Sequence, residues 1–223
     1  MISVVIPTLN AASTLPACLE ALQEGRSMIE QIIVVDGGSV DDTVALAEAV
    51  GAAVLKSEPG RGVQLAKGAE NATGSWLLVL HADSLLTRGW AGVAEEFIKA
   101  DHDQQKAGYF RLKFDEESRA ARRLERIVRW RARWLGLPYG DQGLLISRAH
   151  YQRLGGFEPV PLMEDVKLVR QIGRRNLVAL DAEIVTSARR YRGGYLKRAL
   201  RNAMILMLYF AGVTPERLAR MYS

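Results

Sequence analysis

An imidazole and several carboxylates stand at the ends of short apolar runs in this sequence. His81 and Asp83 directly follow the run over residues 76–80, and Asp36 ends the run over residues 31–35. Short unbroken apolar runs are typical of strands buried in a parallel sheet, and ligands bind outside the carboxyl ends of such strands. These side chains are therefore candidates for a binding site. The alternative for Asp83 is that it only caps the turn that follows it.

Two further acids, Glu164 and Asp165, open a predicted helix. Carboxylates spread in this way suit a nucleotide-diphosphate ligand. One can accept hydrogen bonds from a base or ribose, a second can hold a divalent cation on the diphosphate, and a third can act as a general base. The alternative for this pair is structural, because negative charge at a helix N-terminus stabilises the helix by about 0.3–1 kcal/mol.

Alternating strands and helices would position these residues. We expect strands at residues 3–6, 31–35, 52–55 and 76–80, separated by helices that end near residues 24, 50 and 72. Such alternation gives parallel pairing with right-handed crossovers. The first 86 residues therefore predict the nucleotide-binding half of a doubly wound α/β fold.

The pattern changes in the rest of the chain. The expected helices there cover residues 90–100, 116–135, 164–175 and 195–210, followed by a short terminal helix capped by Thr214. Strands are expected at residues 108–114, near 147, and as two short pieces at 177–180 and 183–186. No internal repeat, low-complexity segment or linker interrupts the 223 residues, so the sequence predicts a single domain.

The composition is that of an ordinary globular protein, with 25% charged and 48% hydrophobic residues. The single cysteine, Cys18, lies in an apolar helical stripe with Leu15 and Leu22, which indicates a core position and a reducing compartment. We see no signal peptide, and the apolar run over residues 203–213 is shorter than the ~20 residues that span a bilayer. We therefore expect a cytoplasmic protein.

The net charge of +5 is unevenly distributed, because arginines concentrate after residue 110. Seven arginines between Arg119 and Arg133 alternate with apolar residues that include Trp130, and residues 203–210 are apolar nearly all round. Such helices either pack within the molecule or in a homodimer, or they make peripheral contact with the inner face of an anionic membrane. Both alternatives remain open, and we expect no nucleic acid partner.

Four motifs occur in a fixed order: VVIPTLN at residues 4–10, VVDGGSVDDT at 34–43, HAD at 81–83 and MEDVKL at 163–168. In this order and spacing the chain resembles the family 2 glycosyltransferases of the GT-A fold. GDQGLLISR, GGF, TSARRY and the ending TPERLARMYS also resemble a bacterial branch labelled arsenosugar-biosynthesis glycosyltransferases. The resemblance implies a Rossmann-like, mostly parallel central sheet flanked by helices, with C-terminal helices.

The same resemblance implies an inverting, metal-dependent glycosyltransferase. It would move a sugar from a nucleotide-sugar donor, UDP-linked by preference, to a hydroxyl acceptor of unknown identity, with Mn²⁺ or Mg²⁺ as cofactor. Within one domain over residues 1–223, residues 1–86 would bind the nucleotide and residues 87–188 would hold acceptor and catalytic groups. Residues 189–223 would form a basic loop and the C-terminal helices.

The resemblance also assigns donor contacts. Asp36 would contact the nucleobase, and Asp83 would be the metal ligand that matches the last acid of the family's Asp-x-Asp motif. His81 replaces the first acid of that motif, so it is either a second metal ligand that suits Mn²⁺ better than Mg²⁺, a ribose contact, or a core residue. The full set of expected donor contacts is Pro7, Thr8, Asn10, Asp36, Gly37, Arg61, His81, Ala82, Asp83, Arg189 and Arg190.

Asp165 matches the second acid of the family's Glu-Asp motif, which implies the general base, and Glu164 belongs to the same catalytic pair. Asp141 and Gln142 would face the acceptor or the sugar; alternatively they form a turn that fixes the next strand. Arg61 contacts the donor or is a solvated loop charge.

Two other classes of function compete with this interpretation. A nucleotidyltransferase also needs carboxylates, a metal and arginines, but it releases pyrophosphate from a nucleoside triphosphate. A non-catalytic module that binds anions or membranes would be indifferent to Asp83→Ala and Asp165→Ala and would bind in a strongly salt-dependent way. No G-x-G-x-x-G follows the first strand, which argues against a dinucleotide-dependent oxidoreductase.

Overall fold

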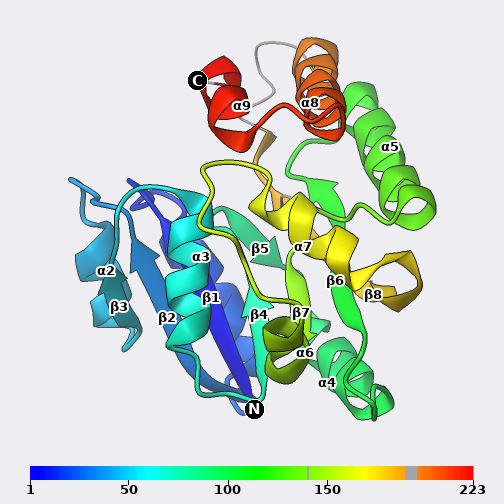
Figure 1. Ribbon diagram of the computed structural model, residues 1–223. Coiled ribbons are helices and arrows are strands. Elements are labelled where there is room, and N and C mark those ends of the chain that lie inside the picture. Colours follow the sequence, from blue (N-terminus) through cyan, green and yellow to red (C-terminus); the bar gives the residue numbers. More distant parts are fainter. Residues whose placement is uncertain (140, 189–194, 223) are drawn as a thin grey trace.

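The computed structural model describes residues 1–139, 141–188 and 195–222, and Figure 1 shows their arrangement. In this part of the chain an eight-stranded sheet has the order β3-β2-β1-β4-β7-β6-β8-β5. The strands are β1 (Ile2–Thr8), β2 (Ile29–Asp36), β3 (Ala53–Lys56), β4 (Trp76–Val79), β5 (Ser84–Leu86), β6 (Ala107–Phe114), β7 (Leu144–Ser147) and β8 (Leu177–Thr186).

Helices cover both faces of this sheet. They are α1 (Leu15–Ala21), α2 (Thr43–Ala49), α3 (Arg61–Glu70), α4 (Trp90–Ala100), α5 (Arg119–Leu135), α6 (Arg148–Arg153), α7 (Glu164–Ile172), α8 (Tyr195–Phe210) and α9 (Pro215–Tyr222). Short 3-10 turns over Leu22–Gly25 and Arg174–Asn176 extend α1 and follow α7. None of the described helices is both long enough and apolar enough to cross a membrane.

The first half of the sheet is parallel, as the alternation of strands and helices predicts. β1 is buried at every position and pairs in parallel with β2 on one side and β4 on the other. In this register Thr8 lies opposite Asp36, so the carboxyl ends of β1 and β2 meet at one edge of the sheet. The polar residues that follow these strands are therefore neighbours.

The second half of the sheet is mixed. β7 runs antiparallel to β4 and β6, β6 and β8 are parallel, and β5 pairs antiparallel with β8. The prediction of two short strands at 177–180 and 183–186 is wrong, because β8 is continuous. The polar residues between the two predicted strands form a bulge, where the register with β6 shifts between Tyr109 and Arg111. The exposed Asp181 in this bulge pairs with Arg111 at 2.6 Å. The sequence analysis also missed β5 and α6.

Two apolar clusters lie on opposite faces of the sheet. α1 and α4 contribute to one cluster, whereas α3, α6 and α7 contribute to the other. Cys18 lies in the first cluster, where burial raises the pKa of its thiol to about 12, so the predicted core position is confirmed. Smaller clusters join α5, α8 and α9 to the rest of the molecule.

Helix α3 packs unusually close to the sheet. A Cβ atom on Gly68 would lie 2.4 Å from a methyl carbon of Val5 and 3.0 Å from one of Val35, both on the strands beneath. In the first turn of the same helix, a Cβ atom on Gly62 would lie 2.4 Å from the backbone oxygen of Glu158. These two glycines fix the height of α3 above β1 and β2, and with it the position of Arg61.

We expect Gly68→Ala to lower the free energy of unfolding by about 1–3 kcal/mol, because the added methyl group overpacks the interface between α3 and the sheet. Gly92 in α4 is the matched control, since a Cβ atom there has no neighbour within 4 Å. Gly92→Ala should raise stability by about 0.5–1 kcal/mol, because alanine favours the helix. Urea denaturation of both variants measures the difference, and equal effects would contradict the close packing.

Candidate functional site

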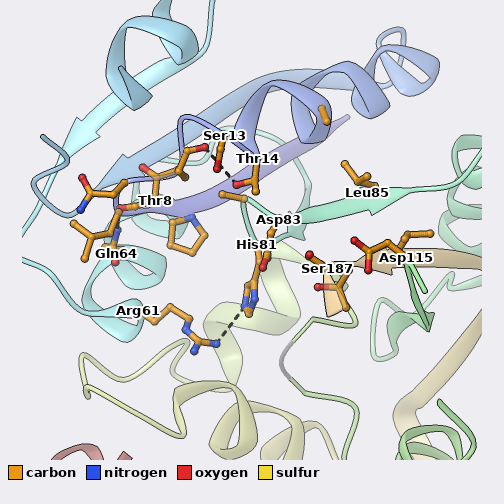
Figure 2. Close-up of a pocket in the computed structure, with 18 of the residues that line it drawn as sticks. Thr8, Ser13, Thr14, Arg61, Gln64, His81, Asp83, Leu85, Asp115 and Ser187 are labelled. Atoms are coloured by element: carbon orange, nitrogen blue, oxygen red, sulfur yellow. Dashed lines mark hydrogen bonds between the residues drawn. The ribbon is translucent and has the colours of Figure 1, made fainter. Parts of the chain in front are cut away.

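A cavity of about 700 Å³ lies at the carboxyl ends of β1 and β4, and Figure 2 shows the side chains that line it. Arg61 and His81 point towards one another across its floor, while Asp115 and Ser187 lie on the side away from Thr8 and Gln64. Volumes of this size are typical of small-molecule sites. Its walls include Pro7, Thr8, Asn10, Ser13, Thr14, Gly60, Arg61, Gln64, His81, Ala82, Asp83, Asp115 and Ser187.

Hydrogen bonds from α3 and from the loop after β2 fix the wall at the end of β1. The side-chain amide of Gln64 donates to the backbone oxygens of Thr8 and Val35, both at 2.7 Å, and so ties α3 to the two strand ends. Asn10 receives a hydrogen bond from the backbone N–H of Val40 at 2.9 Å, and its own N–H donates to Ser39 Oγ. The loops after β1 and β2 are thereby joined.

Asp36 stands behind this wall. Its carboxylate accepts hydrogen bonds from the Thr8 hydroxyl, from the Gly38 N–H, and from both the N–H and the hydroxyl of Ser39. Burial raises the pKa of Asp36, but the hydrogen bonds from Ser39, Gly38 and Thr8 outweigh that effect and lower the pKa below its usual value. The carboxylate therefore positions the edge of the cavity while remaining ionised.

Arg61 and His81 belong to a chain of polar contacts. His81 Nδ1 lies 2.8 Å from an oxygen of Asp141, and its Nε2 lies 3.4 Å from Arg61 Nη1. Because a guanidinium only donates, we assign Nε2 as the acceptor and Nδ1 as the nitrogen that donates to Asp141. On its other side, Arg61 Nε lies 3.7 Å from Glu164. The contacts link the start of α3, the end of β4, the loop before β7 and the start of α7.

His81, Asp83 and Asp141 fit a divalent cation, which would replace either the hydrogen bond from His81 Nδ1 to Asp141 or the contact of Nε2 with Arg61, because a ligating nitrogen needs a free lone pair. One ligand atom from each of the three side chains lies within 4.8 Å of the others, and all three side chains are partly accessible. One imidazole nitrogen with two carboxylates is a donor set that Mn²⁺ accepts more readily than Mg²⁺, which prefers oxygen alone. Asp141 joins this group although the sequence suggests only a contact with acceptor or sugar.

A second, smaller cavity of about 140 Å³ begins on the other side of Arg61. Asp141, Glu164 and Asp165 lie along it. Asp165 accepts a hydrogen bond from the backbone N–H of Val166 at 2.7 Å, which places its carboxylate at the first turn of α7. The opposite walls come from α5 and α8 through Val128, Arg131, Arg198, Asn202 and Ile205.

Glu164 is 2% exposed, and its Oε1 receives no hydrogen bond from the described residues. Burial raises the pKa of its carboxyl to about 7, with a further contribution from the neighbouring charge of Asp165 that Arg61 only partly offsets. A buried acid with a raised pKa beside a second acid and an arginine marks a candidate functional site.

The structure separates the predicted site residues into four groups. Seven line the larger cavity: Pro7, Thr8, Asn10, Arg61, His81, Ala82 and Asp83. Asp141, Glu164 and Asp165 line the smaller one. Asp36, Gly37 and Gln142 line neither cavity. Gln142 is buried and its side-chain amide donates to the backbone oxygen of Phe110, a contact of the kind expected if Gln142 belongs to a turn that fixes the next strand. Arg189 and Arg190 lie outside the described residues.

Several residues of the larger cavity were not expected from the sequence, among them Asp115, Ser187 and Gln64. Asp115 and Ser187 follow the parallel strands β6 and β8, so the rule that ligands bind at carboxyl ends of strands applied to them as well. The expected strands over residues 108–114 and 183–186 end directly before these two residues, so this signal was present in the sequence. No pattern in the sequence marks Gln64 as a site residue. Its role depends on the hydrogen bonds that it donates to the backbone oxygens of Thr8 and Val35, which only the structure shows.

Comparison with known proteins gives a match to a family model. The model described as "Glycosyl transferase family 2" matches residues 3–153, which is more than half of the chain. The matched part includes β1, β2 and β4 with the residues at their carboxyl ends. Glu164 and Asp165 follow the matched part.

A curated relative aligns with a shorter stretch. A PGL/p-HBAD biosynthesis glycosyltransferase of Mycobacterium bovis is 38% identical over 93 residues, which cover 39% of this chain and 36% of the relative. The chain therefore spans about a third of the length of this relative.

Solved structures share the fold. The mannosyltransferase PcManGT from Pyrobaculum calidifontis, in complex with GDP-Man and Mn²⁺, has a TM-score of 0.64 at 21% identity and covers 92% of this chain and 60% of its own. GalNAc-T7 with UDP, GalNAc and Mn²⁺ has a TM-score of 0.66 at 16% identity and covers 84% of this chain and 44% of its own. These likenesses confirm the expected α/β fold with a mostly parallel sheet and C-terminal helices.

The buried carboxyl of Glu164 predicts a stability that depends on pH. Between its usual pKa of 4.5 and about 7, the folded protein keeps a proton that the unfolded chain has released, so this group makes the free energy of unfolding fall as pH rises. The free energy of unfolding of Glu164→Gln, measured relative to that of the wild type, should therefore rise by about 1–3 kcal/mol from the lower to the upper end of that window.

Denaturation curves across the window measure this gain, and Glu48→Gln, which changes an exposed carboxyl on α2, is the matched control. A constant difference between Glu164→Gln and the wild type across the window would show that Glu164 is ionised throughout.

Proposed function

Because the chain belongs to glycosyl transferase family 2, we propose that it transfers a sugar from a nucleotide-diphosphate sugar to a hydroxyl acceptor with inversion at the anomeric carbon. One observation carries the proposal. The cluster of His81, Asp83 and Asp141 lies between a cavity that fits a nucleotide sugar and a smaller cavity that holds Asp165. A donor in the larger cavity, a cation at the cluster and Asp165 as base would then follow one another in the order that transfer requires.

In this proposal the nucleotide lies in the larger cavity. Thr8 and Asn10 form the wall nearest the base, and Asp36 supports that wall through the Thr8 hydroxyl and the Ser39 turn. The sequence suggested that Asp36 contacts the base directly. Because Asp36 does not line the cavity, we propose that it acts on the base through Thr8. A uridine donor is proposed from the resemblance of the motifs alone, because GalNAc-T7 is solved with UDP and PcManGT with GDP-Man.

A divalent cation bound by Asp83, Asp141 and His81 would offset the negative charge that develops on the departing diphosphate. The mixed nitrogen and oxygen donor set favours Mn²⁺, the ion found in both solved structures described above. Arg61 adds a fixed positive charge beside the same cluster, because its guanidinium lies 3.4 Å from His81. Arg189 and Arg190 are proposed to bind the diphosphate as well.

Asp165 is proposed as the general base. Its carboxylate takes the proton of the acceptor hydroxyl, whose oxygen forms a bond to the anomeric carbon from the face opposite the nucleotide. The bond between that carbon and the phosphate oxygen breaks, and the nucleoside diphosphate leaves with the electron pair. Glu164 holds Arg61 towards the cluster through the ion pair at 3.7 Å, and burial prevents it from replacing Asp165 as the group exposed to the acceptor.

The bacterial branch labelled arsenosugar biosynthesis stays a proposal based on the motifs in the second half of the chain, as do the cytoplasmic location and the division into nucleotide and acceptor halves. Membership of the family favours glycosyl transfer over nucleotidyl transfer and over a non-catalytic module. The two reactions differ in what they release and a non-catalytic module releases nothing, which makes the product the decisive observation.

We expect Asp165→Asn to reduce release of nucleoside diphosphate from a sugar donor by at least ~100-fold, because loss of a general base costs that much or more. The affinity for the donor should stay within about a factor of two, since Asp165 lines the smaller cavity rather than the donor cavity. Calorimetric binding and a coupled assay with UDP- and GDP-sugars in Mn²⁺ measure the two quantities.

Asp42→Asn, which changes an exposed acid before α2, is the control that should match the wild type. Wild-type rates in Asp165→Asn would remove Asp165 as the base. Release of pyrophosphate from nucleoside triphosphates by the wild type would instead establish a nucleotidyltransferase.

A further inference from the structure

The outer face of α5 carries an exposed apolar stripe. Ile127, Trp130 and Trp134 are 58%, 55% and 54% exposed. Each of them lies two positions after a buried residue of the same helix. A step of two residues along an α-helix rotates the side chain by about 200°, to the opposite face. The three side chains therefore point away from the core, and their spacing of three and four residues aligns them along the helix.

Arginines flank this stripe along one edge. Arg126, Arg129 and Arg133 are exposed and follow the helical period beside the apolar side chains. The guanidinium carbon of Arg133 lies 5.7 Å from the centre of the Trp134 ring, and that of Arg174 lies 5.6 Å from it. A tryptophan beside arginines, with an aliphatic neighbour one turn away, is typical of helices that lie in the interface of a membrane.

Helix α8 repeats the arrangement next to α5, which it contacts directly (Figure 1). Leu200, Met204 and Met207 are 61%, 44% and 65% exposed and align at spacings of four and three residues. Two positions before Met207, Ile205 is buried against the cluster that joins α8 to α7 and α9. The apolar outer face of α8 therefore has no covering element in the described part of the chain.

The charge of this region limits what can cover it. Helices α5, α8 and α9 together contain twelve basic and two acidic residues. A second copy related by a two-fold axis would place the same arginines face to face, which is unfavourable. A nucleic acid would match the charge but leave the leucine and methionine side chains in water. An anionic lipid surface satisfies both the arginines and the apolar stripes.

We propose that the outer faces of α5 and α8 bind an anionic lipid surface and that the hydroxyl acceptor is carried on a lipid there. The statement about the acceptor rests on the proposed function. Its support is that the inner faces of the same helices, through Arg131 and Asn202, line the cavity that contains Asp165. Docking these helices would bring that cavity to the level of the lipid headgroups.

Co-sedimentation with vesicles tests the surface without reference to activity. The wild type should bind vesicles of phosphatidylcholine and phosphatidylglycerol in equal amounts, bind phosphatidylcholine alone at least about tenfold more weakly, and dissociate as salt is added. Replacing both tryptophans (Trp130→Ser with Trp134→Ser) should weaken binding to the anionic vesicles by at least about tenfold. Reversing two charges (Arg126→Glu with Arg129→Glu) should weaken binding to the anionic vesicles by a similar factor.

Each pair has a matched control elsewhere on the molecule. Val40→Ser with Val50→Ser removes two exposed apolar side chains, and Lys99→Glu with Lys106→Glu makes the same change in net charge near α4, at the opposite end in Figure 1. Both control pairs should bind anionic vesicles as the wild type does. Circular dichroism and the unfolding midpoint confirm that every variant is folded before it is compared.

Three outcomes would overturn the proposal: no binding to anionic vesicles, equal binding to both kinds of vesicle, or equal loss in the α5 variants and their controls. A dimer in sedimentation velocity that the α5 variants abolish, without vesicle binding, would assign the surface to a second copy. Absence of vesicle binding by the wild type, with its nucleoside diphosphate release intact, would overturn this inference and leave the proposed function standing. Vesicle binding without any such release would do the reverse.

Discussion

The guanidinium of Arg61 is the contact on which the candidate site depends. It lies 3.7 Å from the buried carboxyl of Glu164 and 3.4 Å from the imidazole of His81, which in turn contacts Asp141 at 2.8 Å. These contacts connect helices α3 and α7 with the end of β4 and the loop before β7. Without the arginine, a buried acid beside Asp165 would lose its nearest positive charge, and the imidazole would lose the group that defines its orientation.

Packing at a distance from the site sets the position of that arginine. Arg61 begins α3, and the glycines at 62 and 68 allow this helix to lie against the loop at Glu158 and against the strands that carry Thr8 and Asp36. Gln64, one turn along, joins the same two strand ends through their carbonyl groups. The nucleotide wall and the charged floor of the cavity are therefore held by one helix.

Much of this arrangement could be predicted because it follows from local pattern. The carboxyl ends of parallel strands meet at one edge, so Thr8, Asp36 and Asp83 were expected together, and the bounds of the helix over residues 195–210 agree with α8. The bulge in β8, the direction of the Gln142 side chain and the contact between Asp141 and His81 depend on partners distant in sequence, which no local pattern specifies.

The site combines features that are costly for stability with features that suit chemistry. Glu164 is buried with a raised pKa, next to another acid, and part of its carboxyl receives no hydrogen bond from the described residues. Local conflicts of this kind are expected at functional sites, where the surrounding fold offsets them. Here the offset comes from the two extensive clusters on either face of the sheet, which hold α3 and α7 in place.

The central claim is that the cluster of His81, Asp83 and Asp141 holds a cation that binds the diphosphate of a nucleotide donor. Titration calorimetry of nucleoside diphosphates, with and without Mn²⁺, tests it most directly when wild type and Asp83→Asn are compared. Mn²⁺ should strengthen binding of one nucleoside diphosphate to the wild type, and Asp83→Asn should remove this dependence. Equal binding with and without Mn²⁺ in both proteins, or no binding at all, would contradict it.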